Sequence, residues 1–219
     1  MLDLNFTVET AEVEPHAAAP LLIFKLRIAE SVAAEEPTTI PAIALKCQIR
    51  IEPARRRYAA DEEEKLLDLF GTRERWGHTL RSTLWTHTSV VVPPFTGETV
   101  IDLPVPCSFD FNVAATKYFY ALADGEVPLC LLFSGTIFYT DRDGYLQVSQ
   151  IPWEKEASYR LPVQVWKNMM ELYYPKSAWL CLERDTFDRL YRYKSSRGLP
   201  TWEQAIDMLI DSVLEEVES

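Results

Sequence analysis

The sequence predicts an α+β fold, with an antiparallel β-sandwich-like body over residues 1–151 and a helical portion over residues 152–219. In the first region, short segments alternate hydrophobic and polar residues with a period of two, as strands with one solvated face do. After Pro152 the hydrophobic period changes to 3.6, the period of a helix. Because no helix alternates regularly with the strands, we expect antiparallel connections rather than parallel crossovers.

Short strands account for most of the expected body. In residues 43–51, hydrophobic side chains at odd positions alternate with polar ones, which predicts a strand with one solvated face. The turn before the last strand holds Asp143-Gly144, the dipeptide that a tight hairpin favours. The expected strands are residues 2–8, 22–28, 43–51, 84–92, 97–105, 107–113, 117–122, 127–139 and 144–149.

A single helix interrupts the expected strands at residues 60–71. Its acidic first turn suits a helix N-terminus, and its narrow apolar stripe would cover an open end of the sheet. Consecutive carboxylates at residues 62–64 point in different directions on a helix, so we expect them to remain solvated. The three arginines at residues 55–57 could bind an anionic partner, but we favour their neutralisation by these neighbours.

Helices dominate the expected C-terminal portion. The first lies between Pro162, which suits a first-turn position, and Pro175, which stops it. A short strand is expected at Trp179–Glu183, followed by a helix that Gly198 ends. A second helix begins after the turn, because Thr201 and the glutamine three residues later form a capping box.

The order of strand, helix, turn and helix in this segment resembles the ribbon-helix-helix fold. The resemblance implies two chains that pair their strands and bury their helices, with polar side chains of the ribbon reading the DNA major groove. The corresponding ribbon here would be Trp179–Glu183, which offers no donor to a base edge. The DNA-reading positions therefore depart from the family pattern.

The chain as a whole also resembles a bacterial family of unknown function whose genes are associated with nickel–iron hydrogenase loci. The strings IALKCQIRIEPARRRY and WLCLERDTFDRLYRYKSSRGLPTWEQAI carry this resemblance. It implies an accessory role, with hydrogenase maturation or assembly as the setting. Neither string is a catalytic motif, so the resemblance transfers no functional residue.

Charge and cysteine content indicate which partners and which cellular compartment to expect for the protein. A formal net charge of -11 would on average repel phosphate backbones and anionic lipids. No apolar run approaches the roughly 18 residues that a membrane span requires. Four cysteines, each within an apolar run, are expected to be buried thiols, and together these features predict a cytoplasmic protein. The cysteines are Cys47, Cys107, Cys130 and Cys181.

The sequence predicts no catalytic residues, no metal site and no cofactor. Its three histidines, His16, His78 and His87, are scattered and lack the ligand spacings of zinc sites. Motifs for nucleotide binding or nucleophilic hydrolysis are missing, and only 7 glycines are available for close approach to a phosphate. We therefore predict that the protein is not an enzyme.

The favoured function is non-catalytic binding of another protein, as an accessory or assembly factor. The expected site is an aromatic patch around Trp179 and Trp202, with Arg189, Arg192 and Arg197 as a charged rim. Large aromatic side chains of this kind often anchor interfaces, and residues 184–197 carry an excess of three positive charges.

Three alternatives stay open at this point. The C-terminal segment could bind nucleic acid or dimerise in the ribbon-helix-helix manner, giving a homo-oligomer. The sheet of the body could hold a small molecule in a pocket with His87, Asp110 and Tyr118 as converging polar groups. The basic helix could also be an ordinary solvated face that pairs with the acidic helix over residues 207–218.

Overall fold

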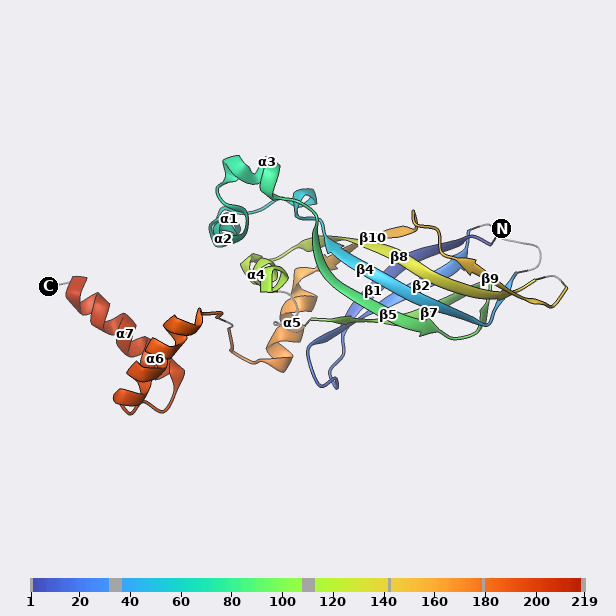
Figure 1. Ribbon diagram of the computed structural model, residues 1–219. Coiled ribbons are helices and arrows are strands. Elements are labelled where there is room, and N and C mark those ends of the chain that lie inside the picture. Colours follow the sequence, from blue (N-terminus) through green and yellow to red (C-terminus); the bar gives the residue numbers. More distant parts are fainter. Residues whose placement is uncertain (1, 32–36, 108–112, 142, 179, 218–219) are drawn as a thin grey trace. The chain divides into compact units, whose positions relative to one another are not determined.

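In a computed structural model, the protein divides into two compact units, Met1–Ser177 and Ala178–Ser219 (Figure 1). The structure describes residues 2–31, 37–107, 113–141, 143–178 and 180–217. Antiparallel sheets and separate helices confirm the predicted α+β class.

The division of the chain lies after Ser177, whereas the sequence placed it at residue 151. The reason lies in β10 (Glu156–Pro162) and α5 (Val163–Tyr173), which both belong to the larger unit. β10 pairs with β8 (Glu126–Thr140), and α5 buries Trp166 and neighbouring side chains in the core of the same unit. We call the larger unit the body.

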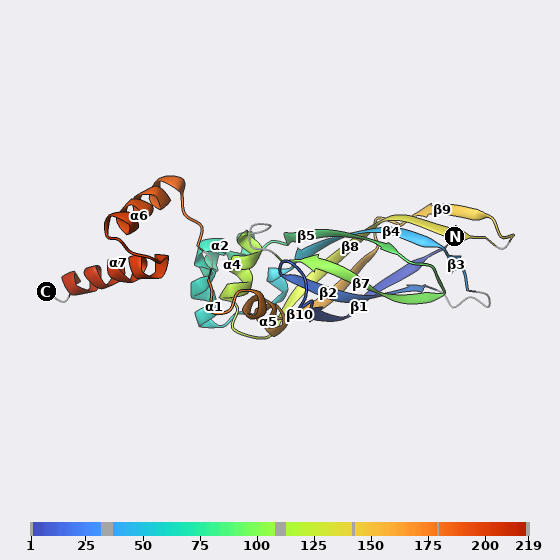
Figure 2. The ribbon, with the colours of Figure 1, turned by 90° about the horizontal axis from the view of Figure 1, so that it is seen from below.

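Two antiparallel sheets of the body enclose a shared core (Figures 1 and 2). The smaller sheet has the order β1-β2-β7, and the larger has the order β10-β8-β4-β5, with β9 pairing to β8. A short β3-β6 pair lies beside them. Besides β8 and β10, the strands are β1 (Leu4–Val13), β2 (Leu21–Glu30), β3 (Thr39–Ile40), β4 (Ala42–Ile51), β5 (Thr83–Val92), β6 (Phe95–Thr96), β7 (Glu98–Pro106) and β9 (Leu146–Gln150).

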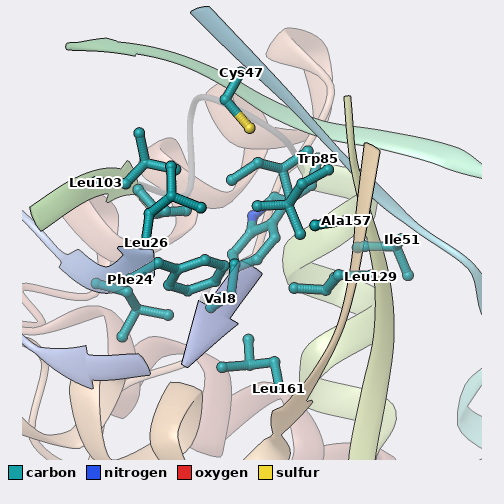
Figure 3. Close-up of a cluster of buried hydrophobic side chains, with 14 of the residues drawn as sticks. Val8, Phe24, Leu26, Cys47, Ile51, Trp85, Leu103, Leu129, Ala157 and Leu161 are labelled. Carbon is teal, nitrogen blue, oxygen red and sulfur yellow. The ribbon is translucent and has the colours of Figure 1, made fainter. Parts of the chain in front are cut away.

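The core forms because alternate residues of facing strands point inward (Figure 3). Phe24 and Leu26 of β2 are fully buried, and they face Cys47 and other side chains of the larger sheet. The odd-numbered positions of β4 are all buried, as the sequence predicted for residues 43–51. Alternation with one solvated face therefore identified β4 correctly.

The predicted strand at residues 117–122 is wrong, because this segment belongs to α4 (Val113–Ala121). Ala115, Tyr118 and Phe119 of this helix are buried at helical spacing, and the aromatic run obscured that repeat. Most of the predicted strand at residues 107–113 lies outside the described residues. β10 was missed, although Ala157, Tyr159 and Leu161 alternate along it.

Short helices between β4 and β5 cover one end of the sandwich (Figure 1). The single helix expected at residues 60–71 is two helices, α1 and α2, with buried Leu66 between them. The covering role predicted for this segment is confirmed, because Leu66 belongs to the core cluster. The segment contains η1 (Pro53–Arg55), α1 (Ala60–Lys65), α2 (Leu67–Phe70), η2 (Arg73–Arg75) and α3 (Trp76–Thr79).

Two glycines shape β8 and its hairpin. Gly135 has a φ of 138°, and a side-chain Cβ built there would lie 2.0 Å from the carbonyl oxygen of Ala44. Gly144 has a φ of 82°, and its amide donates to the Asp141 carbonyl at 3.1 Å. The predicted hairpin between β8 and β9 is therefore confirmed.

Candidate functional site

The C-terminal unit is built from α6 (Arg184–Ser196) and α7 (Trp202–Val217), which we call the helix pair. Gly198 ends α6 with a φ of 64°, and the Leu199 amide donates to the Lys194 carbonyl at 3.1 Å. The Thr201 hydroxyl accepts the Gln204 amide at 3.3 Å and caps α7. The predicted helix, turn and helix are therefore confirmed.

An aromatic cluster joins the two helices near this turn. The ring of Trp202 lies 5.3 Å from Phe187 and 6.1 Å from Tyr191, between ring centroids. The ammonium of Lys194 lies 5.5 Å from the centre of the Trp202 ring, in a cation–π contact. Trp202 is thus engaged inside the helix pair, while Phe187 and Tyr191 stay 44% and 54% exposed.

The rest of α7 carries an apolar stripe that α6 leaves uncovered. Leu209, Ile210, Val213 and Leu214 repeat at spacings of three and four residues, so they share one face of the helix. Their exposed fractions are 37%, 52%, 58% and 57%. Among the helix-pair side chains that the structure describes, Ala205 alone is buried. The helix pair therefore lacks a core of its own.

Charged rows flank the apolar faces of both helices. On α6, Arg184 and Arg192 lie on one row at four-residue spacing, with Asp188 between them. On α7, Asp207 and Asp211 form the corresponding row, each three residues before a side chain of the apolar stripe. No ion pair joins α6 to α7 among the described residues. The predicted pairing of basic and acidic faces within one chain is thus not seen.

The predicted arginine rim does not close around Trp202. Arg189 lies two residues from both Phe187 and Tyr191, which places it on the opposite side of α6. Arg192 donates from Nε to the Asp188 carbonyl at 3.3 Å, on the flank of the helix. The guanidinium of Arg197 lies 5.5 Å from the centre of the Tyr193 ring.

The predicted ribbon strand is not formed by residues 180–183. A ribbon strand needs a second strand to satisfy its backbone groups, and α6 begins directly after Glu183. Trp179, the other predicted anchor, lies outside the described residues. Of the predicted C-terminal site, the structure describes the helix pair.

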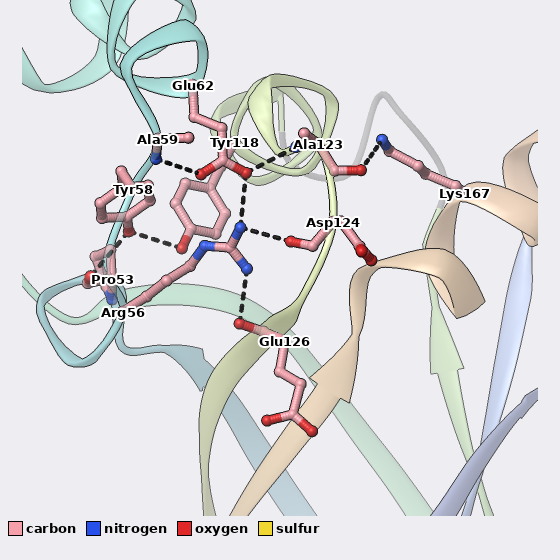
Figure 4. Close-up of polar contacts among 10 residues, drawn as sticks. All are labelled: Pro53, Arg56, Tyr58, Ala59, Glu62, Tyr118, Ala123, Asp124, Glu126 and Lys167. Carbon is pink, nitrogen blue, oxygen red and sulfur yellow. Dashed lines mark hydrogen bonds and ion pairs between the residues drawn. The ribbon is translucent and has the colours of Figure 1, made fainter.

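A buried ion pair fastens the helical segment between β4 and β5, residues 53–79, which we call the end cap, to the rest of the body (Figure 4). Arg56 and Glu62 approach to 2.7 Å with side chains 9% and 4% exposed. Arg56 also donates to the carbonyls of Glu126 at 2.9 Å and Asp124 at 2.6 Å, and Glu62 accepts the Ala123 amide at 2.7 Å. The expectation that Glu62 is solvated was wrong, because α1 packs it against the loop before β8. Neutralisation of Arg56 by a neighbour is confirmed.

A chain of phenol groups lies beside this ion pair. The Tyr58 hydroxyl donates to the Pro53 carbonyl at 2.8 Å and lies 2.9 Å from the Tyr118 hydroxyl. Because Tyr58 has one proton to give, Tyr118 must donate to Tyr58, which leaves acceptor capacity on the Tyr118 oxygen. Burial, with a smaller contribution from Tyr58, raises the pKa of Tyr118.

Tyr118 also lines a cavity of about 220 Å³ beneath the end cap. Phe70, Thr79 and Ala115 line it as well, from α2, α3 and α4. The predicted small-molecule set is not assembled there as a whole. His87 is exposed on β5, and Asp110 lies outside the described residues.

Metal-ligating side chains do not gather in the part of the chain that the structure describes. No group of three or more His, Cys, Asp or Glu side chains could hold a metal ion among those residues. The four cysteines are free, but the expectation that all are buried was wrong. Cys181 is exposed because it lies in the segment before α6, and Cys130 is half-buried. Burial raises the pKa of Cys47 to about 12, which disfavours the reactive thiolate.

The family model named DUF6084 matches residues 1–218 and therefore both units. The chain belongs to DUF6084, a family of unknown function. None of the curated proteins matches this DUF6084 chain. It is similar to a crystal structure of a protein assigned as ApaA, from Bordetella pertussis. That similarity has 13% identity and a TM-score of 0.25, and covers 73% of this chain and 93% of the other.

Membership of DUF6084 confirms the predicted resemblance to a family of unknown function. The association with hydrogenase loci and the ribbon-helix-helix resemblance stay predictions. Among the described helices of this DUF6084 protein, none has the length and hydrophobicity needed to cross a membrane.

Proposed function

We propose that this DUF6084 protein is a non-catalytic binding protein whose helix pair docks on a second protein chain. The supporting observation is the apolar stripe of α7, where Ile210, Val213 and Leu214 are each more than half exposed. Full burial of such a side chain contributes about 1.5–3 kcal/mol, so a partner that covers the stripe gains considerable free energy. An exposed apolar surface bordered by charged rows is typical of protein interfaces.

The charges of the helix pair favour a protein over a nucleic acid as partner. Residues 202–214 carry Glu203, Asp207 and Asp211 and no basic residue, so the uncovered face has an acidic border. Phosphate contacts supply most of the affinity in nucleic-acid binding, and this border would oppose them. The ribbon that would read base edges is not formed by residues 180–183.

The setting of this function is proposed to be the assembly of a larger protein complex in the cytoplasm. The resemblance to proteins encoded at nickel–iron hydrogenase loci makes hydrogenase subunits and their maturation factors the first partners to test. The body would act as the folded platform that the helix pair joins to the complex.

The test compares two substitutions on opposite sides of α7. Ile210→Glu places a charge in the apolar stripe, whereas Met208→Glu places one two residues away, on the opposite face. Met208 is 39% exposed and is the matched control. The tagged protein and both variants are purified from the native host, and the proteins bound in stoichiometric amount are identified by mass spectrometry.

We expect a defined partner with the parent protein and with Met208→Glu, and at least tenfold less of it with Ile210→Glu. The identified partner, purified separately, should bind the three proteins in the same order. Equal binding by all three would contradict the proposal, as would a fully protected α7 in a monomer without partner.

A second candidate function is supported by the cavity beside Tyr118. A volume of about 220 Å³ exceeds the roughly 150 Å³ at which an apolar cavity holds benzene. The free acceptor capacity on the Tyr118 oxygen would select a small aromatic molecule with one hydrogen-bond donor. We expect phenol to raise the melting temperature more than toluene does, and Tyr118→Phe to remove that difference. Equal shifts with the two compounds would contradict this function.

A further inference from the structure

We propose that the partner of the helix pair is a second copy of the same chain. In this dimer, α6 of each copy packs antiparallel against α7 of the other. The inference rests on the proposed function, because it names the partner of the same surface.

The apolar surfaces of the two helices complement each other. α7 offers Ile210, Val213 and Leu214, and α6 offers the half-exposed rings of Phe187 and Tyr191. These side chains and Leu209 are 37–58% exposed, and a stable interface buries about 800 Å² per partner, a little over half of it apolar. Contact between the two surfaces would bury apolar side chains from both helices of each copy.

The charges of the two helices are also complementary. The row of α6 beside its apolar face carries Arg184, Asp188 and Arg192, a net charge of one positive, whereas the row of α7 carries Asp207 and Asp211 and no positive charge. In a two-fold symmetric contact, α6 meets α7 of the partner and α7 meets its α6, so both contacts join opposite charges. A contact between two copies of α7 would instead bring acidic rows together.

Helix geometry selects the antiparallel direction. Seen along each helix from its N-terminus, the charged row lies on the same rotational side of the apolar face in α6 and in α7. When two helices pack antiparallel, flanks on the same rotational side come together, whereas parallel packing separates them. Antiparallel packing therefore brings Arg184 and Arg192 beside Asp207 and Asp211 of the other copy.

The second copy would also supply the hydrophobic core that the helix pair lacks. A unit of about forty residues rarely holds a sufficient core by itself. Ala205 is the one buried side chain among those described in this unit. Four helices from two copies enclose a core between them, as helix bundles do.

The experiment reverses the charges of one helix at a time in the full chain. One variant carries Arg184→Glu and Arg192→Glu, and the other carries Asp207→Lys and Asp211→Lys. Molar mass is measured by light scattering and sedimentation equilibrium for each variant, for their equimolar mixture and for the parent. Arg189→Glu, on the opposite side of α6, is the matched control.

We expect a dimer for the parent protein and for the control. Each reversed variant should dimerise on the order of 100-fold more weakly, because like charges then face each other. The mixture should recover the dimer, since the reversed α6 of one chain meets the reversed α7 of the other. A chain with all four substitutions should also dimerise, which keeps the test decisive if one variant folds poorly.

Two results would overturn the inference. The first is a parent protein that stays monomeric at micromolar concentration; if Ile210→Glu still abolishes binding of another protein, the proposed function survives. The second is a parent dimer that neither charge reversal weakens. If the parent is monomeric and Ile210→Glu changes no binding, the proposed function fails as well.

Discussion

α5 and α7 have the same kind of amphipathic pattern and opposite surroundings. On α5, the apolar residues Val163, Trp166, Met169 and Met170 are at most 4% exposed, because the helix packs into the core of the body. On α7, the apolar stripe from Leu209 to Leu214 is 37–58% exposed. An amphipathic pattern thus shows that one face of a helix is apolar. It does not show which other element packs against that face.

Substitutions of apolar residues should give the largest difference in the free energy of unfolding between the body and the helix pair. Trp166 stacks on Phe119 with 4.9 Å between ring centroids, so Trp166→Ala leaves a large cavity in the body. We expect a loss of about 3–5 kcal/mol in the free energy of unfolding, measured with urea. Leu214→Ala in α7 should change the unfolding of the body by less than about 0.5 kcal/mol. Comparable losses would show that body and helix pair unfold as one unit.

Removal of the buried Glu62 carboxylate should give the next largest loss in the stability of the body. Glu62→Ala leaves Arg56 buried without its ion pair, and we expect a loss of about 3 kcal/mol in the stability of the body. Glu64→Ala, two residues away on the exposed side of α1, is the matched control and should cost less than about 0.5 kcal/mol. Urea denaturation followed by tryptophan fluorescence measures both. Similar values for the two variants would contradict the role given to Arg56 and Glu62.

The smallest expected effect is the alkaline instability of the body. Because burial raises the pKa of Tyr118, the unfolded chain releases this proton first as the pH rises past about 10. The stability contribution is therefore complete below pH 10 and is lost above it, at up to about 1.4 kcal/mol per pH unit. Tyr118→Phe should flatten the decline between pH 9.5 and 11, whereas Tyr145→Phe, at an exposed position, should not. An unchanged decline in Tyr118→Phe would contradict this assignment.

The sequence predicted the strands better than the helices that cover them. Strands such as β4 alternate because one face is solvated, and that alternation depends on the strand alone. α4 is buried on more than one side, so its aromatic residues obscured the helical period. Glu62 looked solvated because its burial depends on the distant loop that holds Ala123 and Asp124.

For the candidate site, the sequence predicted the helices and the turn, but the anchoring side chains that it favoured differ from the exposed stripe on which the proposed function rests. Arg189 was included because the charge count ignored which side of α6 it occupies. Ile210 and Leu214 were not among the predicted site residues, although their spacing in α7 was readable, because large aromatic side chains with an arginine rim were taken as the anchors of the interface. Which apolar face stays uncovered depends on tertiary packing, and local spacing does not contain that information.

The most direct test of the central claim is amide hydrogen exchange on the full chain across a hundredfold range of protein concentration. Residues 206–214 of α7 should become more protected as the concentration rises, because a second copy covers them. Residues 43–51 of β4 should show protection that does not change with concentration. Protection of α7 that never develops, or that is complete in a sample that light scattering shows to be monomeric, would contradict an α7 covered by association of two chains.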